Sequence, residues 1–246
     1  MEILVIFIIG FTASFFGSFT SSGSSMLAFT FLGLYGISPF AALGIFKVGT
    51  FGMQLGGLYN FARADKIIWK RVVTLTLIGI VGAYIGANIV ISLDEAVLSK
   101  IIGFVLLLCV PLALFKPSLG VLSVQTSLKK EYMGHIMYFL TSIWGYSIVV
   151  GAGIVNMYSQ AYFYGMSILE IKGTSKIPAL IKGLVAITVF VQAGIVNWEL
   201  GGVFFLGGFA GSFLGTHYSI KIGDTWLRHV LFLSVLVVSI KLILGW

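Results

Sequence analysis

Two lysines stand well inside apolar stretches of the sequence, where an ammonium group is costly to bury. Lys47 and Lys176 each lie roughly eight residues inside a predicted helix, about 12 Å from its end at the rise of an α-helix. A charge at that depth normally faces a partner or a water-filled cavity. The alternative is that the flexible stem carries the charge back to the polar boundary. The first interpretation predicts a site that attracts an anion.

Two short runs of small and polar residues break the apolar pattern, and both could add hydrogen-bond donors. Residues 21–25 read SSGSS, and residues 151–153 read GAG. A helix that starts after such a break presents unpaired N–H groups and the positive end of its dipole, which suits an anion. The alternative is that small residues at these places only permit tight packing of helices.

The acidic residues all lie at or near predicted loops, so the predicted site contains no carboxylate. The usual proton or sodium relay of a pump therefore has no obvious position. The single cysteine, Cys109, and the three scattered histidines form no metal-binding pattern, and neither a metal nor a cofactor is expected. The natural ligand is a small anion with several oxygen atoms. The candidate substrate-binding residues are Ser22, Gly23, Ser24, Ser25, Lys47, Gln54, Gly151, Ala152, Gly153, Asn156, Gln160, Thr174, Ser175 and Lys176.

An internal repeat places the two lysines at matching positions. A shift of 129 residues aligns residues 36–91 with residues 165–220 without a gap, and Lys47 then falls on Lys176. Lys182 lies deeper by the same count but falls on Met53, so it is either a one-sided specificity element or a side chain that reaches back to the headgroups. A duplicated, strongly apolar chain is typical of solute transporters built from two structural repeats.

The composition indicates a protein that lies in a membrane. The chain of 246 residues is 59% hydrophobic and 9% charged, with a mean hydropathy of +1.08, whereas soluble domains have about 25% charged residues. The net charge of +7 comes mostly from short loops, where basic residues fix orientation and meet anionic lipid, so nucleic-acid binding is not expected. The spacings Gly82-x-x-x-Gly86 and Gly211-x-x-x-Gly215 are expected to let helices pack closely.

These patterns predict an all-α polytopic membrane protein with a single transmembrane domain. Repeat one is expected over residues 1–115, a linker over 116–131 and repeat two over 132–246. The first apolar stretch has neither a basic start nor a cleavage site, so it is expected to remain as the first helix. Each repeat should hold a broken helical hairpin and three longer helices, which gives eight full spans, or ten when the short limbs are counted. The predicted helices are 3–20, 25–35, 39–61, 70–91 and 96–115 in repeat one, and 133–148, 154–164, 168–192, 198–220 and 225–244 in repeat two.

The charges of matching loops favour repeats of inverted topology. Residues 62–71 carry a net charge of +3, whereas their counterparts 191–200 carry only Glu199. Residues 92–100 carry −1, and their counterparts 221–229 carry +1. Because basic loops stay in the cytoplasm, matching loops should face opposite sides of the membrane. Parallel repeats of four helices are the alternative, if each broken segment crosses only once.

Several short motifs follow one another in a fixed order along the chain. They lie at residues 16–17, 23, 36–42, 151–153, 165–167, 173–176, 194–198 and 211–215. This order resembles the sulfite exporter TauE/SafE family over nearly the whole chain. The resemblance implies a multi-pass inner-membrane protein that moves sulfur-containing anions such as sulfite, thiosulfate or organosulfonates. The chain departs from the family at the first break, where serines stand in place of a frequent run of glycines.

The residues and the resemblance together predict a secondary transporter or facilitator of small sulfur-containing oxyanions, working as an exporter, and not an enzyme. A passive anion channel is one alternative, because the sequence does not separate a channel from a carrier. A membrane-embedded enzyme or accessory subunit is another, although it would need acids, histidines or cysteines clustered inside the spans. The expected partners are a small anionic solute and the lipid bilayer of the inner (plasma) membrane. The sequence leaves open whether the chain forms a homo-oligomer.

Overall fold

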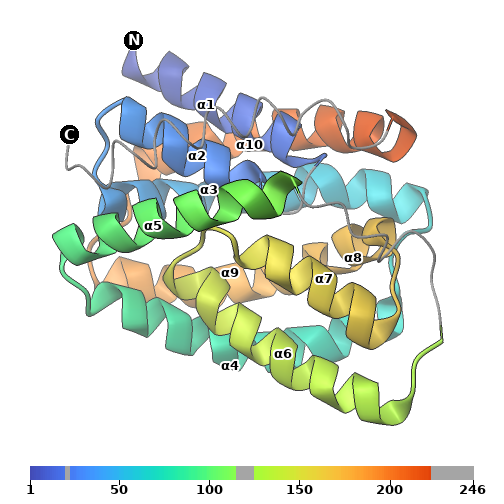
Figure 1. Cartoon of the computed structure of the whole chain (residues 1–246). Coiled ribbons are helices and arrows are strands. Elements are labelled where there is room, and N and C mark those ends of the chain that lie inside the picture. Colours follow the sequence, from blue (N-terminus) through green and yellow to red (C-terminus); the bar gives the residue numbers. More distant parts are fainter. Residues whose placement is uncertain (20–22, 115–124, 223–246) are drawn as a thin grey trace.

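The computed structural model describes residues 1–19, 23–114 and 125–222, with residues 106 and 108–114 described as backbone only, and the chain is helical throughout this part (Figure 1). The helices are α1 (Glu2–Gly17), α2 (Gly23–Leu34), α3 (Pro39–Arg63), α4 (Trp69–Ile91), α5 (Glu95–Leu114), α6 (Leu128–Ser147), α7 (Ala152–Tyr164), α8 (Ile168–Thr174), α9 (Lys176–Gln192) and α10 (Trp198–Ile222).

The predicted helices are confirmed within the described residues, with a few changes at their ends. The predicted helix 225–244 lies outside the described residues. Helix α6 begins at Leu128 and not at 133, inside the predicted linker, because the side chain of Ser127 accepts a hydrogen bond from the Lys130 N–H and caps the first turn. The division of the chain into two repeats and a linker stays a prediction.

The predicted helix 168–192 is wrong as a single straight helix. It consists of α8 and α9, which are bent by 42° at Ser175. Pro178 explains the bend, because its nitrogen has no hydrogen to donate to the carbonyl of Thr174 and its ring crowds that carbonyl. The matching position in α3 is Gly49, and α3 continues unbroken.

The second break covers residues 148–151, whereas the sequence predicts it at residues 151–153. Helix α6 ends at Ser147, and α7 begins at Ala152, so Ala152 and Gly153 belong to the first turn of α7 and not to the break. Gly151 turns the chain with φ +79° and is the N-cap of α7. Val149 also has a positive φ, of +69°, which is strained for a β-branched residue. At the first break the predicted residues Gly23, Ser24 and Ser25 likewise belong to a helix, α2.

The long helices pack in two matching groups. Helix α10 lies along α1 and α3, while α4 lies along α6 and α9. Under the shift of 129 residues, α3 corresponds to α8 and α9, and α4 corresponds to α10. In Figure 1, α3 and α10 run from left to right, whereas α9 and α4 run from right to left. Helices at matching places in the sequence therefore run in opposite directions.

The glycine pairs act as predicted, by letting helices approach. A methyl group added at Gly82 of α4 would lie 2.8 Å from the Ser142 Cβ of α6. One added at Gly215 of α10 would lie 2.9 Å from the Phe15 Cα of α1. Both distances are too short for real carbon atoms, so these glycines are required for the packing of α4 on α6 and of α10 on α1.

Among the described residues, Trp69–Ile91 is long and apolar enough to cross a membrane alone, with a mean hydropathy of 1.9, and the bent pair α8–α9 meets the same test as one span. Helices α1 and α2 are apolar but shorter. The predicted count of eight or ten spans stays a prediction.

Candidate functional site

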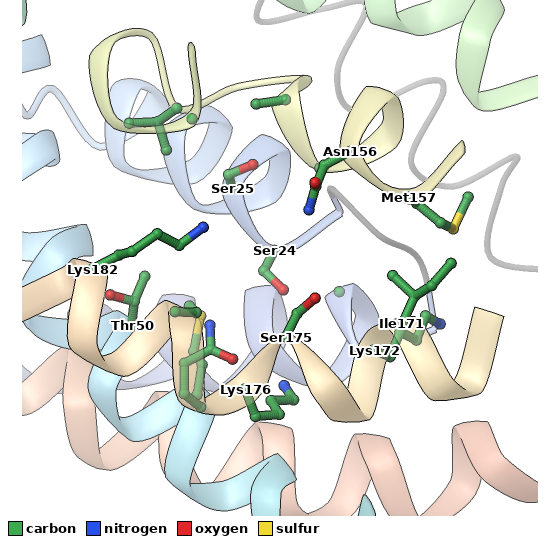
Figure 2. Close-up of a pocket in the computed structure, with 18 of the residues that line it drawn as sticks. Ser24, Ser25, Thr50, Asn156, Met157, Ile171, Lys172, Ser175, Lys176 and Lys182 are labelled. Carbon is green, nitrogen blue, oxygen red and sulfur yellow. The ribbon is translucent and has the colours of Figure 1, made fainter. Parts of the chain in front are cut away.

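A cavity of about 280 Å³ lies where the two broken hairpins meet the middle of α3 and the bend between α8 and α9 (Figure 2). Four lysines line it, and the described lining includes neither aspartate nor glutamate. They come from three helices, α3, α8 and α9. They are Lys47, Lys172, Lys176 and Lys182.

Lys47 is held inside the molecule and does not reach the lipid boundary. Its side chain is only 4% exposed, and the neighbouring residues of α3 are largely apolar. Its Nζ donates a hydrogen bond of 3.3 Å to the carbonyl oxygen of Gly145, near the end of α6. The same nitrogen lies 3.9 Å from the centre of the Tyr146 ring, within the range of a cation–π contact.

Lys182 approaches Tyr146 from another helix. Its Nζ donates to the hydroxyl of Tyr138 at 2.9 Å and to the hydroxyl of Ser142 at 3.3 Å. It lies 4.5 Å from the centre of the Tyr138 ring and 5.5 Å from that of Tyr146. Only 7% of this lysine is exposed, so it does not extend to the headgroups.

The other two lysines stand near the bend between α8 and α9. Lys176 is partly exposed, and its Nζ lies 5.8 Å from the centre of the Phe61 ring. Lys172 donates hydrogen bonds to the carbonyl oxygens of Ser18, at 3.2 Å, and Phe19, at 3.0 Å. These carbonyls lie at the end of α1, where the helix dipole is negative and favours a cation.

The hydrogen bonds and ring contacts that hold Lys47 and Lys182 all come from neutral groups. Carbonyl oxygens, hydroxyls and π faces stabilise an ammonium group without cancelling its charge. The ion pair between Arg71 and Glu131 lies outside the cavity. A buried charge without a counter-ion is unfavourable, and an anion in the cavity would supply one.

Several predicted polar residues surround the same space. Asn156 accepts a hydrogen bond from the Thr141 hydroxyl at 3.2 Å through its Oδ1, which leaves its NH₂ group for the cavity. The N–H groups in the first turn of a helix have no carbonyl partner within that helix. In α7 one of them, that of Ile154, donates to the carbonyl of Gly151 instead. Figure 2 shows Ser24, Ser25, Asn156, Ser175 and Lys182 directed toward one space. Predicted residues that line the cavity are Ser24, Ser25, Lys47, Gln54, Ala152, Gly153, Asn156, Ser175 and Lys176.

Other predicted residues do not line the cavity. Gln160 is buried behind it and donates to the Ser175 hydroxyl at 3.5 Å, so it supports a lining residue. The hydroxyl of Thr174 accepts from the Ile68 N–H at 2.9 Å and ties α8 to the start of α4. Gly23 and Gly151 lie at the helix breaks but outside the lining, and Ser22 lies outside the described residues.

The candidate set missed the polar face of α6. Tyr138, Ser142 and Tyr146 are spaced four residues apart, so they share one face of the helix, and all three line the cavity. This spacing was visible in the sequence and could have identified them. Lys172 gave no such signal, because its counterpart under the repeat is Leu43.

Comparison with known proteins agrees with the resemblance seen in the sequence. The chain is 22% identical to a probable membrane transporter protein of Haemophilus influenzae, over 98% of this chain and 95% of that protein. It is 24% identical to probable membrane transporter proteins of a Sinorhizobium species, over 97% and 91%, and of Xylella fastidiosa, over 96% and 91%. No solved structure matches the chain. The sequence model of the sulfite exporter TauE/SafE family matches residues 6–242, and the chain therefore belongs to this family of membrane transporters.

Proposed function

We propose that the chain is a secondary transporter or facilitator that carries a small sulfur-containing oxyanion, such as sulfite, thiosulfate or an organosulfonate, out of the cell. The observation that carries the proposal is a cavity lined by four lysines whose described lining holds no acid. The family name supports a sulfur oxyanion as the solute. The protein acts in the inner membrane, which its chain crosses several times.

The anion is bound by charge and by hydrogen bonds together. Lys47 and Lys176 supply positive charge, while Ser24, Asn156 and Ser175 donate hydrogen bonds to the oxygen atoms. Hydrogen bonds to a charged group contribute about 1.5–3 kcal/mol each, roughly twice the value for neutral pairs. The described lining holds four lysines and no carboxylate, so the site favours an anion over a cation.

The chain consists of two inverted repeats, and alternating access arises from motion between two bodies. One body holds α1, α3 and α10, and the other holds α4, α6 and α9, as the packing of these helices supports. Each body contains helices of both repeats, because α4 and α10 have exchanged places. The cavity lies between the bodies, with Lys47 on one and Lys182 on the other. Rocking of the bodies opens it to either side in turn.

The membrane potential favours export. An inside-negative potential opposes the uptake of an anion by about 2.3 kcal/mol per charge per 100 mV. Among the lining residues that the structure describes, no carboxylate is placed to couple uptake to protons or sodium. Efflux down the electrical gradient needs no such coupling.

Thermal unfolding of the purified protein tests anion binding. Sulfite, sulfate, thiosulfate, taurine and sulfoacetate are added in turn, and a true ligand at 100 times its dissociation constant stabilises the folded state by about 2.7 kcal/mol. The variants Lys47→Met and Lys176→Met should lose the stabilisation, whereas Lys70→Met, in the first turn of α4 and outside the cavity lining, should keep it. Undiminished stabilisation of both cavity variants would remove these lysines from the site.

Flux measurements in liposomes distinguish a carrier from a channel. We expect saturable flux of the anion and counterflow against a labelled pool, because each binding event is coupled to a conformational step. Unitary conductance in planar bilayers would instead indicate the passive channel.

A further inference from the structure

We infer that Lys47, Tyr146 and Lys182 form a paired-lysine clamp that selects oxyanions with two negative charges over those with one. This inference rests on the proposed function and adds to it the charge class of the substrate. It also assigns the selectivity to Lys182, whose counterpart in the other repeat is Met53.

The clamp is built from three helices that meet at one ring. Lys47 comes from α3 and Lys182 from α9, and their ammonium nitrogens lie 3.9 and 5.5 Å from the centre of the Tyr146 ring on α6. The hydroxyl of Tyr146 donates to the carbonyl oxygen of Ala179 at 3.2 Å, which fixes the ring against α9. Both lysines and the tyrosine are at most 9% exposed.

The space around Lys182 fits the long stem of a lysine side chain. Its stem lies over Gly79 of α4, where an added methyl group would come within 2.5 Å of the Lys182 Cδ. The matching glycine in α10, Gly208, faces Met53 in the same way, with 3.2 Å between the added methyl and the Met53 Cγ. The two repeats therefore keep the same cradle and fill it with side chains of similar length but different charge.

Two adjacent ammonium groups set the charge that the ligand must carry. Their partners Gly145, Tyr138, Ser142 and Tyr146 are neutral, so when both lysines are protonated none of these partners balances their charge. A monoanion cancels one charge and leaves the other buried without a counter-ion, which is unfavourable. A dianion cancels both. Lys172 and Lys176 line the same cavity but lie outside the clamp, because they contact the end of α1 and the Phe61 ring and not Tyr146.

Competition binding with anions of known charge tests the clamp. Thiosulfate and sulfate serve as dianions, and methanesulfonate and nitrate as monoanions, all with the purified full-length protein in detergent. The wild-type protein should bind thiosulfate at least about tenfold tighter than methanesulfonate, a difference that corresponds to about 1.4 kcal/mol. The variant Lys182→Met, which installs the residue found at the matching position of the other repeat, should bring the two dissociation constants within about threefold of each other, because one of the paired charges is gone. It should still bind methanesulfonate.

The variant Lys182→Arg is the matched control. It keeps the positive charge and should keep the preference for dianions. A wild-type protein that binds anions without regard to charge, or a Lys182→Met variant that keeps the full preference, overturns the clamp but leaves the proposed function standing. A wild-type protein that binds none of these anions refutes the proposed function itself. If Lys182→Met does not fold, the wild-type ratio alone decides.

Discussion

Lys47 and Lys182 resemble solvated ions more than members of salt bridges. The carbonyl of Gly145 and the hydroxyls of Tyr138 and Ser142 take the place of water around them. A carboxylate in these positions would have satisfied the lysines permanently and left no attraction for a solute. Neutral partners hold the two side chains in place without a negative charge that would compete with a ligand.

Adding one carboxylate to the lining should abolish anion binding. Asn156→Asp keeps the shape of the side chain but places a negative charge opposite the lysines, so it competes with the anion for them. We expect the dissociation constant for the transported anion to rise by about a hundredfold, or about 2.8 kcal/mol. Isothermal titration calorimetry on the purified variant measures it.

The control for this variant is Asn197→Asp, in the loop that caps α10. Its side chain accepts a hydrogen bond from the Leu200 N–H at 3.0 Å, a role that aspartate fills equally well. Binding should be unchanged in the control. Equal affinities of Asn156→Asp and the wild-type protein would show that the anion binds elsewhere.

Part of this site could be predicted from the sequence, because the internal repeat places two lysines at matching positions. Lys47 and Lys176 were found because the two repeats preserve them, and both line the cavity. The partners of Lys182 could not be found in this way, since they are 40 and 44 residues away in sequence and meet it only when α6 and α9 both pack on α4. Long-range pairs of this kind depend on tertiary packing and leave no local pattern.

Among the elements, the bend between α8 and α9 has the most direct effect on the site. It lies at Ser175, and both Ser175 and Lys176 line the cavity. The bounds of this segment were predicted correctly from the sequence, but its bend was not, although the sequence contains Pro178. A proline within a predicted helix either bends the helix or ends it, and the packing of neighbouring helices decides which of the two occurs.

Replacement of the proline should straighten the bend and weaken binding. Pro178→Ala restores an N–H donor for the carbonyl of Thr174, and the straighter helix carries Ser175 and Lys176 away from the anion. We expect about tenfold weaker binding, or about 1.4 kcal/mol. Pro39→Ala, at the first turn of α3 where proline is tolerated, should bind as the wild-type protein does. Normal affinity of Pro178→Ala would mean that the bend has no part in the site.

The glycines of α10 allow a second test of the elements. Gly211 lies against the backbone of Phe11 in α1, whereas an added methyl group at Gly202 of the same helix meets nothing within 4 Å. Gly211→Ala should lower the stability by about 1–3 kcal/mol through overpacking. Gly202→Ala should be neutral or raise it by up to about 1 kcal/mol, since alanine favours the helix. Thermal unfolding in detergent compares the two, and equal midpoints would contradict the close approach of α10 and α1.

In the whole molecule, the two predicted repeats exchange one long helix each. Helix α10 packs on helices of the first repeat, and α4 packs on helices of the second. Helices at matching places run in opposite directions in Figure 1, which is the arrangement expected when a duplicated unit inserts in both orientations. The loop charges predict inverted repeats, and this stays a prediction. The packing of α10 on α1 and α3, and of α4 on α6 and α9, could not be predicted from the sequence, because no local pattern specifies which helices become neighbours.

Inverted repeats place matching loops on opposite sides of the membrane. Single cysteines at Ala64 and Ala193, which follow α3 and α9, should label from opposite sides in intact cells or oriented vesicles. The native Cys109 is first replaced by serine to give a background without thiols. An impermeant maleimide added from one side should reach only one of the two positions, and labelling of both from the same side would exclude inversion.

The most direct measurement of the central claim is the position of a bound oxyanion in a crystal. Selenite, a heavier analogue of sulfite, gives an anomalous signal that locates its selenium atom without ambiguity. We expect one strong peak inside the cavity, with oxygen atoms about 3 Å from the Lys47 Nζ, and no such peak for Lys47→Met. Peaks confined to the basic residues where α3 ends and α4 begins, Arg63, Lys66 and Lys70, with an empty cavity, would contradict anion binding in the cavity.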